Sequence, residues 1–131
     1  MKWLFSRTQI EVAGIYPVEA DEPVYLVELI IRNCKAPIRC REITQSDPSL
    51  PPKNWQVPYD EKILDEMGIK IIGDPFNEKN RPEWWRGNIR LAFFFHYLDL
   101  TKPLKTPLGD ISLPSPSERP ARLATIVYEP P

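Results

Sequence analysis

The densest apolar stretch of the chain is Ile89-Arg90-Leu91-Ala92-Phe93-Phe94-Phe95-His96-Tyr97-Leu98-Asp99-Leu100. Every odd position from Ile89 to Tyr97 is apolar. The even positions hold Ala92, Phe94, Leu98 and Leu100, with His96 among them. Successive side chains of a strand point to opposite faces of its sheet. Apolar side chains on both faces therefore predict a central strand over residues 89–100 that is covered from both sides.

Two segments of alternating polarity precede this stretch. In residues 8–15, Ile10 and Val12 alternate with Gln9 and Glu11, which is the period of a half-buried strand. In residues 24–32, one face is wholly apolar and the other carries two charged residues. The apolar face holds Tyr25, Val27, Leu29 and Ile31, and Glu28 and Arg32 lie on the other face. A short acidic connection joins the two segments, so we predict an antiparallel hairpin.

The remaining elements are shorter. Residues 60–67 predict one helix, because Asp60 can cap its first turn and Gly68 can end it. Three apolar side chains fall on one side of this helix: Ile63, Leu64 and Met67. Short strands are expected up to Thr44 and over residues 69–72, 111–113 and 121–129, with a turn at residues 107–110.

Proline is unusually frequent, at 16 of 131 residues, against a usual share of about 5%. Prolines belong in rigid loops and at strand edges. Six or seven short strands with one helix, lacking a regular strand-helix alternation, predict a mainly β fold. We expect a β-sandwich or a curved antiparallel sheet, with an α+β fold as the alternative. The length fits a single domain, residues 1–131.

Composition bears on the kind of partner. The 17 basic and 18 acidic residues nearly cancel, whereas a nucleic-acid binder usually has a basic excess, so we expect no nucleic-acid partner. The longest apolar stretch is shorter than the roughly 20 residues that span a bilayer, and the apolar run after Lys2 is too short for a signal peptide. We therefore expect no membrane association and a cytoplasmic protein.

No motif for a cofactor or a metal is present. The chain has no glycine-rich phosphate loop and no fingerprint of a nucleotide cofactor. Two cysteines and one histidine fall short of the roughly four ligands of a zinc site. We expect neither a cofactor nor a metal ion.

His96 is the single histidine, and it is the candidate for general acid–base chemistry. Its neighbours are apolar, and Tyr97 and Asp99 fall on the opposite face of a regular strand. We favour a structural, hydrogen-bonded histidine in the core over a catalytic one. Catalysis at His96 would need a partner that the fold supplies from elsewhere.

Residues 32–41 form the best charged candidate. A basic patch is formed by Arg32, Lys35, Arg39 and Arg41, and such a patch can meet a phosphate or an acidic protein surface. A solvated hairpin face with Glu28 and Glu42 as counter-charges is the favoured interpretation.

Cys34 and Cys40 lie in the same segment. A tight turn at residues 36–38 would bring them face to face across a hairpin and permit a disulfide. Reduced thiols are the favoured state in a cytoplasm.

Tryptophan-bearing loops are the most unusual local feature. Trp84, Trp85 and Arg86 are adjacent, and Trp55 lies in a loop with four prolines. Tryptophan and arginine are enriched where binding energy concentrates. The four residues are therefore a candidate partner-binding site. The alternative is that these loops close the ends of the β fold.

These observations favour a non-enzymatic domain that binds another protein, such as an inhibitor, an immunity-type factor or an assembly factor. Rigid loops lose little entropy on binding, which suits recognition. A small enzyme that uses His96 is the alternative, and a carrier of an apolar small ligand ranks lower, since it rests on the aromatic residues 93–97 alone. A homo-oligomer formed through an edge strand is left open.

Overall fold

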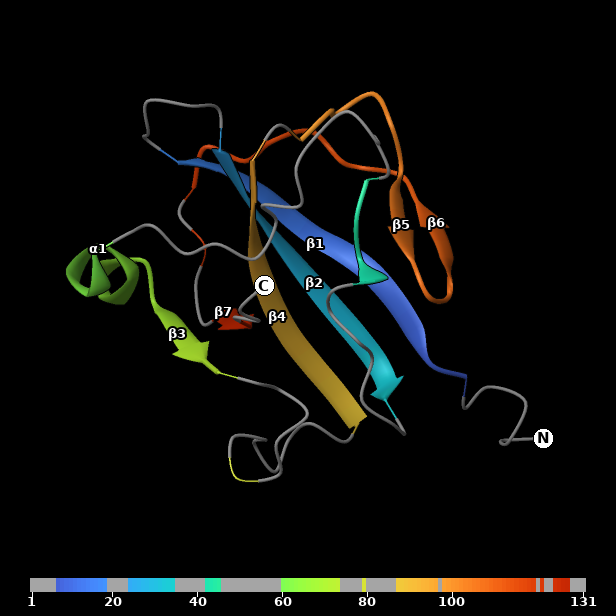
Figure 1. Cartoon of the computed structure of the whole chain (residues 1–131), viewed down its shortest axis with the longest axis horizontal. Helices are drawn as coiled ribbons and strands as arrows, with labels where there is room; N and C mark the ends of the chain where they lie inside the picture. Colours follow the sequence, from blue (N-terminus) through green and yellow to red (C-terminus); the bar gives the residue numbers. More distant parts are fainter. Residues whose placement is uncertain are drawn as a thin grey trace.

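A computed structural model describes residues 7–18, 24–34, 42–45, 60–73, 79, 87–96, 98–119, 121 and 124–127. These residues form a five-stranded sheet, a two-stranded sheet and one short helix, α1 (Figure 1). The predicted mainly β fold with one short helix is confirmed. None of the described helical residues forms a helix with the length and apolarity needed to cross a membrane.

Three long antiparallel strands make up most of the large sheet. They are β1 (Gln9–Val18), β2 (Val24–Cys34) and β4 (Gly87–His96). β2 lies between β1 and β4 and pairs with both, which confirms the predicted hairpin. β1 runs through Pro17 to Val18, beyond its predicted end, because proline is tolerated in an edge strand.

β4 is shorter than the sequence pattern predicted. It ends at His96, and the chain turns at Asp99 before it can continue as a strand. The Asp99 carboxylate accepts hydrogen bonds from the backbone N–H of Thr101 at 2.9 Å and from its hydroxyl at 2.6 Å. An aspartate that bonds the backbone two residues ahead initiates a turn. The apolar Leu98 and Leu100 therefore lie outside the strand, and Leu100 belongs to the turn.

The far side of the sheet differs from the antiparallel expectation. β3 (Ile69–Ile72) and β7 (Ala124–Val127) pair in parallel, and β7 pairs in parallel with β4 through Ala92 and Ile126. The strand order is β1-β2-β4-β7-β3. The sheet is therefore mixed, and β1 and β3 are its two edges.

A bulge in β1 keeps its apolar side chains on one face. Val12 is the partner of Leu29 and Gly14 is the partner of Glu28, so Ala13 is an extra residue. An extra residue reverses the alternation of a strand. Ile15 consequently joins Val12 on the same face and is fully buried.

The small sheet is a hairpin of β5 (Leu104–Thr106) and β6 (Gly109–Ile111). The turn was predicted from residues 107–110, whereas β5 was not. Gly109 has a φ of 121°, a conformation that glycine adopts readily. The Thr106 hydroxyl donates to the Gly109 carbonyl at 2.8 Å and accepts from the Leu108 N–H at 3.2 Å.

Helix α1 (Glu61–Glu66) is close to its predicted position. The Asp60 carboxylate accepts from the Lys62 N–H at 3.0 Å, and Gly68 has a φ of 72°. Leu64 is buried and Met67 is half-buried, but Ile63 is 45% exposed. The prediction that Ile63 shares the buried side is wrong, since a helix this short presents one narrow stripe to the sheet.

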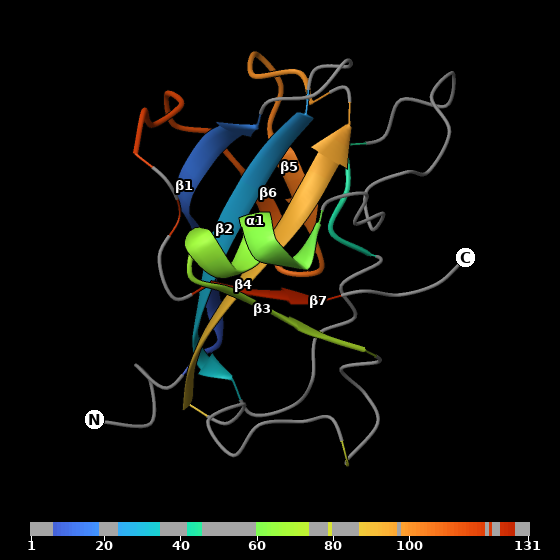
Figure 2. The same ribbon diagram turned by 90° about the vertical axis from the view of Figure 1, so that its left-hand side faces the viewer.

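Two apolar clusters lie on the two faces of the large sheet. One holds Leu29, Leu91 and Phe93 and is covered by the β5–β6 side of the molecule. The other holds Leu26 and Phe94 and is covered by α1 and β3 (Figures 1 and 2). The side chains of β4 are shared between them, so β4 is the central strand that the sequence predicted.

Candidate functional site

Most of the predicted site residues fall outside the part of the chain that the structure describes. They are Trp55, Trp84, Trp85 and Arg86 of the candidate partner site, Lys35, Arg39 and Arg41 of the basic patch, and Cys40. The structure therefore places only Arg32, Cys34 and His96 among the candidates. Cys34 is buried at the end of β2.

Arg32 pairs with a carboxylate on the neighbouring strand, Glu11. Its Nη2 donates to Oε1 of Glu11 at 2.7 Å, from the neighbouring strand β1. Both side chains are about half exposed, and ion pairs of this kind contribute little to stability. Of the two predicted counter-charges of the basic patch, Glu28 is buried and lies 3.7 Å from Nε of Arg90.

Glu28 is a buried carboxylate in the middle of the large sheet. Only 4% of the residue is exposed, and its Cα partners are two small residues, Gly14 on β1 and Ala92 on β4. Its Oε1 lies 3.7 Å from Nε of Arg90, while no described group donates to its Oε2. The sequence did not predict that Glu28 is buried, because a polar residue in an alternating strand is expected to face solvent.

Tyr16 lies beside this carboxylate. A Cβ added to Gly14 would lie 2.6 Å from the Tyr16 hydroxyl, so the tyrosine ring lies directly over Gly14. Burial raises the pKa of Glu28, and the positive charge of Arg90 opposes that rise. The pKa of Tyr16 is also raised, mainly by burial and secondly by the negative charge of Glu28. The positive charge of Arg90 partly offsets this rise. Glycine at residue 14 is thus what gives the phenol room beside Glu28.

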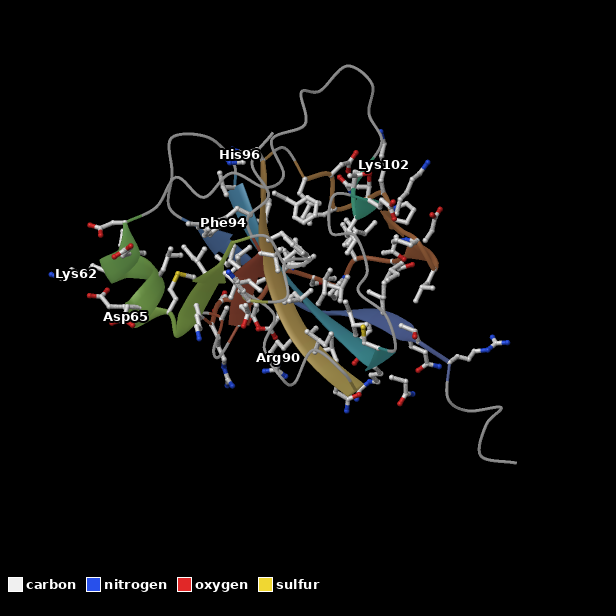
Figure 3. The ribbon with its side chains drawn as sticks, turned by 60° about the horizontal axis from the view of Figure 1, so that its bottom comes forward. Lys62, Asp65, Arg90, Phe94, His96 and Lys102 are labelled. Atoms are coloured by element: carbon white, nitrogen blue, oxygen red, sulfur yellow. The ribbon has the colours of Figure 1, made fainter. Side chains whose placement is uncertain are left out.

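His96 lies at the C-terminal end of β4, beyond Arg90 and Phe94 on the same strand (Figure 3). Its Cα partner is Val24, the residue is half-buried, and both ring nitrogens are shielded from solvent. Within the described ranges, no three histidine, cysteine or acidic side chains are grouped so that they could hold a metal ion. The catalytic role of His96 stays a prediction.

The aromatic side chains of β4 pack in the two apolar clusters. Phe93, Phe94 and Phe95 are at most 1% exposed. The rings of Phe93 and Phe95 meet edge to face, with centroids 6.5 Å apart and an interplanar angle of 88°. Their packing accounts for the aromatic run without a bound ligand.

A groove of about 560 Å³ lies between α1 and β3, and we call it the α1–β3 groove. Seven residues line it: Glu61, Lys62, Leu64, Asp65, Ile69, Lys70 and Ile71. Leu64 and Ile69 are buried, whereas Ile71 is 39% exposed. Figure 2 shows α1 and β3 together on the side of the molecule that faces the viewer.

The two edges of the large sheet differ. At β1, the Ser117 N–H donates to the Ile15 carbonyl at 2.6 Å, and β6 contacts the same strand. At β3, no strand among the described residues pairs with the outer edge. Unpaired N–H and C=O groups on an edge strand are a template for another chain. The sequence did not reveal this edge, because edge position depends on strand order.

Comparison with known proteins gives no assignment, since no family model, no curated protein and no solved structure matches the chain.

Proposed function

We propose that this chain is a non-enzymatic protein-binding domain that takes up an extended segment of another protein at the α1–β3 groove. The observation that supports the proposal most is the outer edge of β3 beside that groove, with which no strand in the described part of the chain pairs. Addition of a strand to an exposed sheet edge is a common mode of peptide recognition. Backbone hydrogen bonds supply affinity, and pockets beside the edge select side chains.

Exposed apolar side chains add to this support. Among the described residues, the large hydrophobic side chains with substantial exposure are Ile63, Ile71 and Leu108. Ile63 lies on α1 and Ile71 on β3, while Leu108 lies in the β5–β6 turn on the opposite side of the molecule (Figure 1). Ile71 is an exposed apolar side chain on the edge strand itself, and it suits a partner that covers it.

The experiment compares three variants of the immobilised chain in capture from a cell lysate, with captured proteins identified by mass spectrometry. Ile71→Asp places a charge in the groove and is expected to abolish capture of the specific partner. Leu108→Asp makes the same change in an exposed turn and is expected to leave capture intact. An identified protein that Ile71→Asp loses and Leu108→Asp retains supports the proposal.

The tryptophan loops supply the competing site. Alanine at Trp84, Trp85 and Arg86 tests it in the same assay. If this triple variant loses the partner while Ile71→Asp retains it, binding belongs to the loops and the groove assignment is wrong. If all variants retain the same proteins, neither surface is the docking site.

A further inference from the structure

Building on that proposed function, we infer that Glu28 is a pH switch for the α1–β3 groove. Ionisation of its buried carboxyl opens the joint between β4 and β7 and thereby releases the β3 wall of the groove. The inference rests on the alignment of Glu28, this joint and the groove in one row of the sheet. Its test needs no partner, so it fails separately from the proposed function, which the lysate capture tests.

One row of paired residues runs across the large sheet and connects the carboxylate to the groove. The row, from β1 to β3, is Gly14, Glu28, Ala92, Ile126 and Ile71. Residues paired directly across a sheet point to the same face, which here is the face covered by α1. Ile71 lines the groove at one end of the row. Glu28 is therefore separated from this groove residue by Ala92 and Ile126 alone.

The joint between β4 and β7 is held by little backbone pairing. Among the described residues, β4 and β7 are paired only through Ala92 and Ile126. By contrast, β2 is paired with β1 and with β4 over most of its length, and β3 is paired with β7 from Ile69 to Ile72. Proteins open locally where an element has few such contacts. The β3–β7 pair is thus the part of the sheet that separates most readily from the rest.

Glu28 lies next to this joint and has little to compensate a negative charge. It is the β2 partner of Ala92, and only 4% of the residue is exposed. No described group donates to its Oε2, and its Oε1 lies 3.7 Å from Nε of Arg90, whose side chain is about half exposed. Burial of a carboxylate without donors is costly. Separation of β7 from β4 opens the Ala92 side of Glu28 to water and relieves this cost.

Two polar groups face Glu28 from the neighbouring strands. Tyr16 lies beside it on β1 and Arg90 on β4, whereas β7 has no titratable residue. The other charged residues of the surrounding elements are exposed, so water screens their charges. They are Glu11 on β1, Arg32 on β2, Lys70 on β3, and Glu61, Lys62, Asp65 and Glu66 on α1.

The direction of the switch follows from these surroundings. Burial has the larger influence on Glu28 and raises its pKa, while the positive charge of Arg90 opposes the rise. A group whose pKa is raised in one state stabilises that state in its protonated form. The closed joint is therefore fully stabilised below the ordinary pKa of 4.5 and loses this stabilisation as the pH rises through the closed-state value. A partner that needs the closed edge binds more weakly as the open share of molecules grows.

Amide hydrogen exchange of the full chain tests whether the joint opens by itself. A two-stranded pair is marginal in water, so the β7 amides lose protection when β3 and β7 leave the sheet. Thr125 and Ile126 in β7 are expected to exchange at least about tenfold faster than Val27 and Leu29 in β2, relative to free amides. Equal protection of the four amides would mean that β7 opens only with the whole protein, and it overturns the inference.

The pH dependence of the same exchange tests the role of Glu28. Protection of the β7 amides, corrected for the intrinsic pH dependence of exchange, is expected to fall at least about threefold from about pH 4 to about pH 8. The Lys105 amide, which donates to the Thr44 carbonyl at 2.8 Å in another part of the fold, should keep its protection. An equal fall at Lys105, or no fall at β7, contradicts the switch.

Three variants assign the titrating group. Glu28→Gln should abolish the pH dependence of the β7 amides and hold them at the high protection seen in acid. The matched control, Glu11→Gln, removes an exposed carboxylate of the same sheet and should retain the full dependence. Arg90→Gln removes the charge that favours ionisation of Glu28, so the midpoint should move to higher pH. Persistence of the dependence in Glu28→Gln, or its loss in Glu11→Gln, overturns the inference.

Discussion

Glu28 on β2 and Arg90 on β4 are diagonal neighbours across the sheet, with 3.7 Å between Oε1 of the carboxylate and Nε of the guanidinium. The acid is buried and the base is about half exposed. Their attraction is therefore partly screened, while the carboxylate bears the cost of leaving water. Oε2 has no hydrogen-bond donor among the described residues, so the ionised form of Glu28 is poorly compensated.

Replacement of that charge should stabilise the protein at neutral pH. Glu28→Gln keeps the shape of the side chain and removes the buried charge, and we expect a gain of about 1 kcal/mol in the free energy of unfolding at pH 7. The measurement is urea unfolding. The control is Glu11→Gln, whose carboxylate is exposed and paired with Arg32. This change should alter stability by less than about 1 kcal/mol, and it should not stabilise the protein.

The pH dependence of this gain follows from the raised pKa of Glu28. A group whose pKa is raised on folding provides stability in its protonated form. That stability is fully present below the ordinary pKa of 4.5 and is lost as the pH rises through the folded-state value. The advantage of Glu28→Gln should thus be small in acid and grow above pH 4.5. A constant advantage across this range would contradict the assignment of the charge as its cause.

Tyr16 reports on the same carboxylate. Burial is the main cause of its raised pKa, and the negative charge of Glu28 is the second. In Glu28→Gln the second cause is absent, so the pKa of Tyr16 should fall toward its ordinary value of 10.0 without reaching it. Tyrosine absorbance during alkaline titration, with a Tyr16→Phe variant to assign the signal, measures the change. A rise in the pKa of Tyr16 speaks against the proximity of the two groups.

Gly14 is the third member of this group, and its role is to leave space. In Gly14→Ala the new Cβ would lie 2.6 Å from the Tyr16 hydroxyl, so the ring must move. We expect a loss of about 1–3 kcal/mol in the free energy of unfolding. A double-mutant cycle with Tyr16→Ala tests the cause. The cost of alanine at residue 14 should largely vanish when the ring is absent, and additive effects would refute steric conflict.

The sequence predicted the long strands, the helix and its cap, because each carries a local pattern. Alternation identified β1 and β2, and Asp60 with Gly68 bounded α1. It did not predict the parallel pairing of β3 with β7, since strand order depends on contacts between distant segments. For the same reason it did not identify the β3 edge. Glu28 was misplaced because a single polar residue in an alternating strand carries no signal of what covers that face.

A part-buried polar contact from Gln45 holds the turn that follows β4. The Gln45 side chain accepts from the Asp99 N–H at 2.9 Å and donates to the carbonyls of Asp99 at 2.8 Å and Lys102 at 3.1 Å. Gln45→Glu keeps the acceptor and places a negative oxygen against both carbonyls. We expect a loss of about 1–3 kcal/mol at pH 7 by chemical denaturation. Partial recovery in acid, where a protonated carboxyl can donate again, distinguishes this cause from lost packing.

Asp60 connects the cap of α1 to the α1–β3 groove. Its carboxylate accepts from the Lys62 N–H at 3.0 Å, and its carbonyl accepts from Ile63 and Leu64. A helix of six residues is marginal without packing and capping, so Asp60→Ala should cost about 1 kcal/mol. Asp60→Asn retains an acceptor and should cost less.

Faster amide exchange at Lys62, Ile63 and Leu64 in Asp60→Ala, and not in Asp60→Asn, would show that the cap holds the helix wall of the groove in place. Because α1 supplies Glu61, Leu64 and Asp65 to the groove, the alanine variant should also capture less of the specific partner than the asparagine variant. Equal binding by both variants would mean that the groove forms independently of the cap.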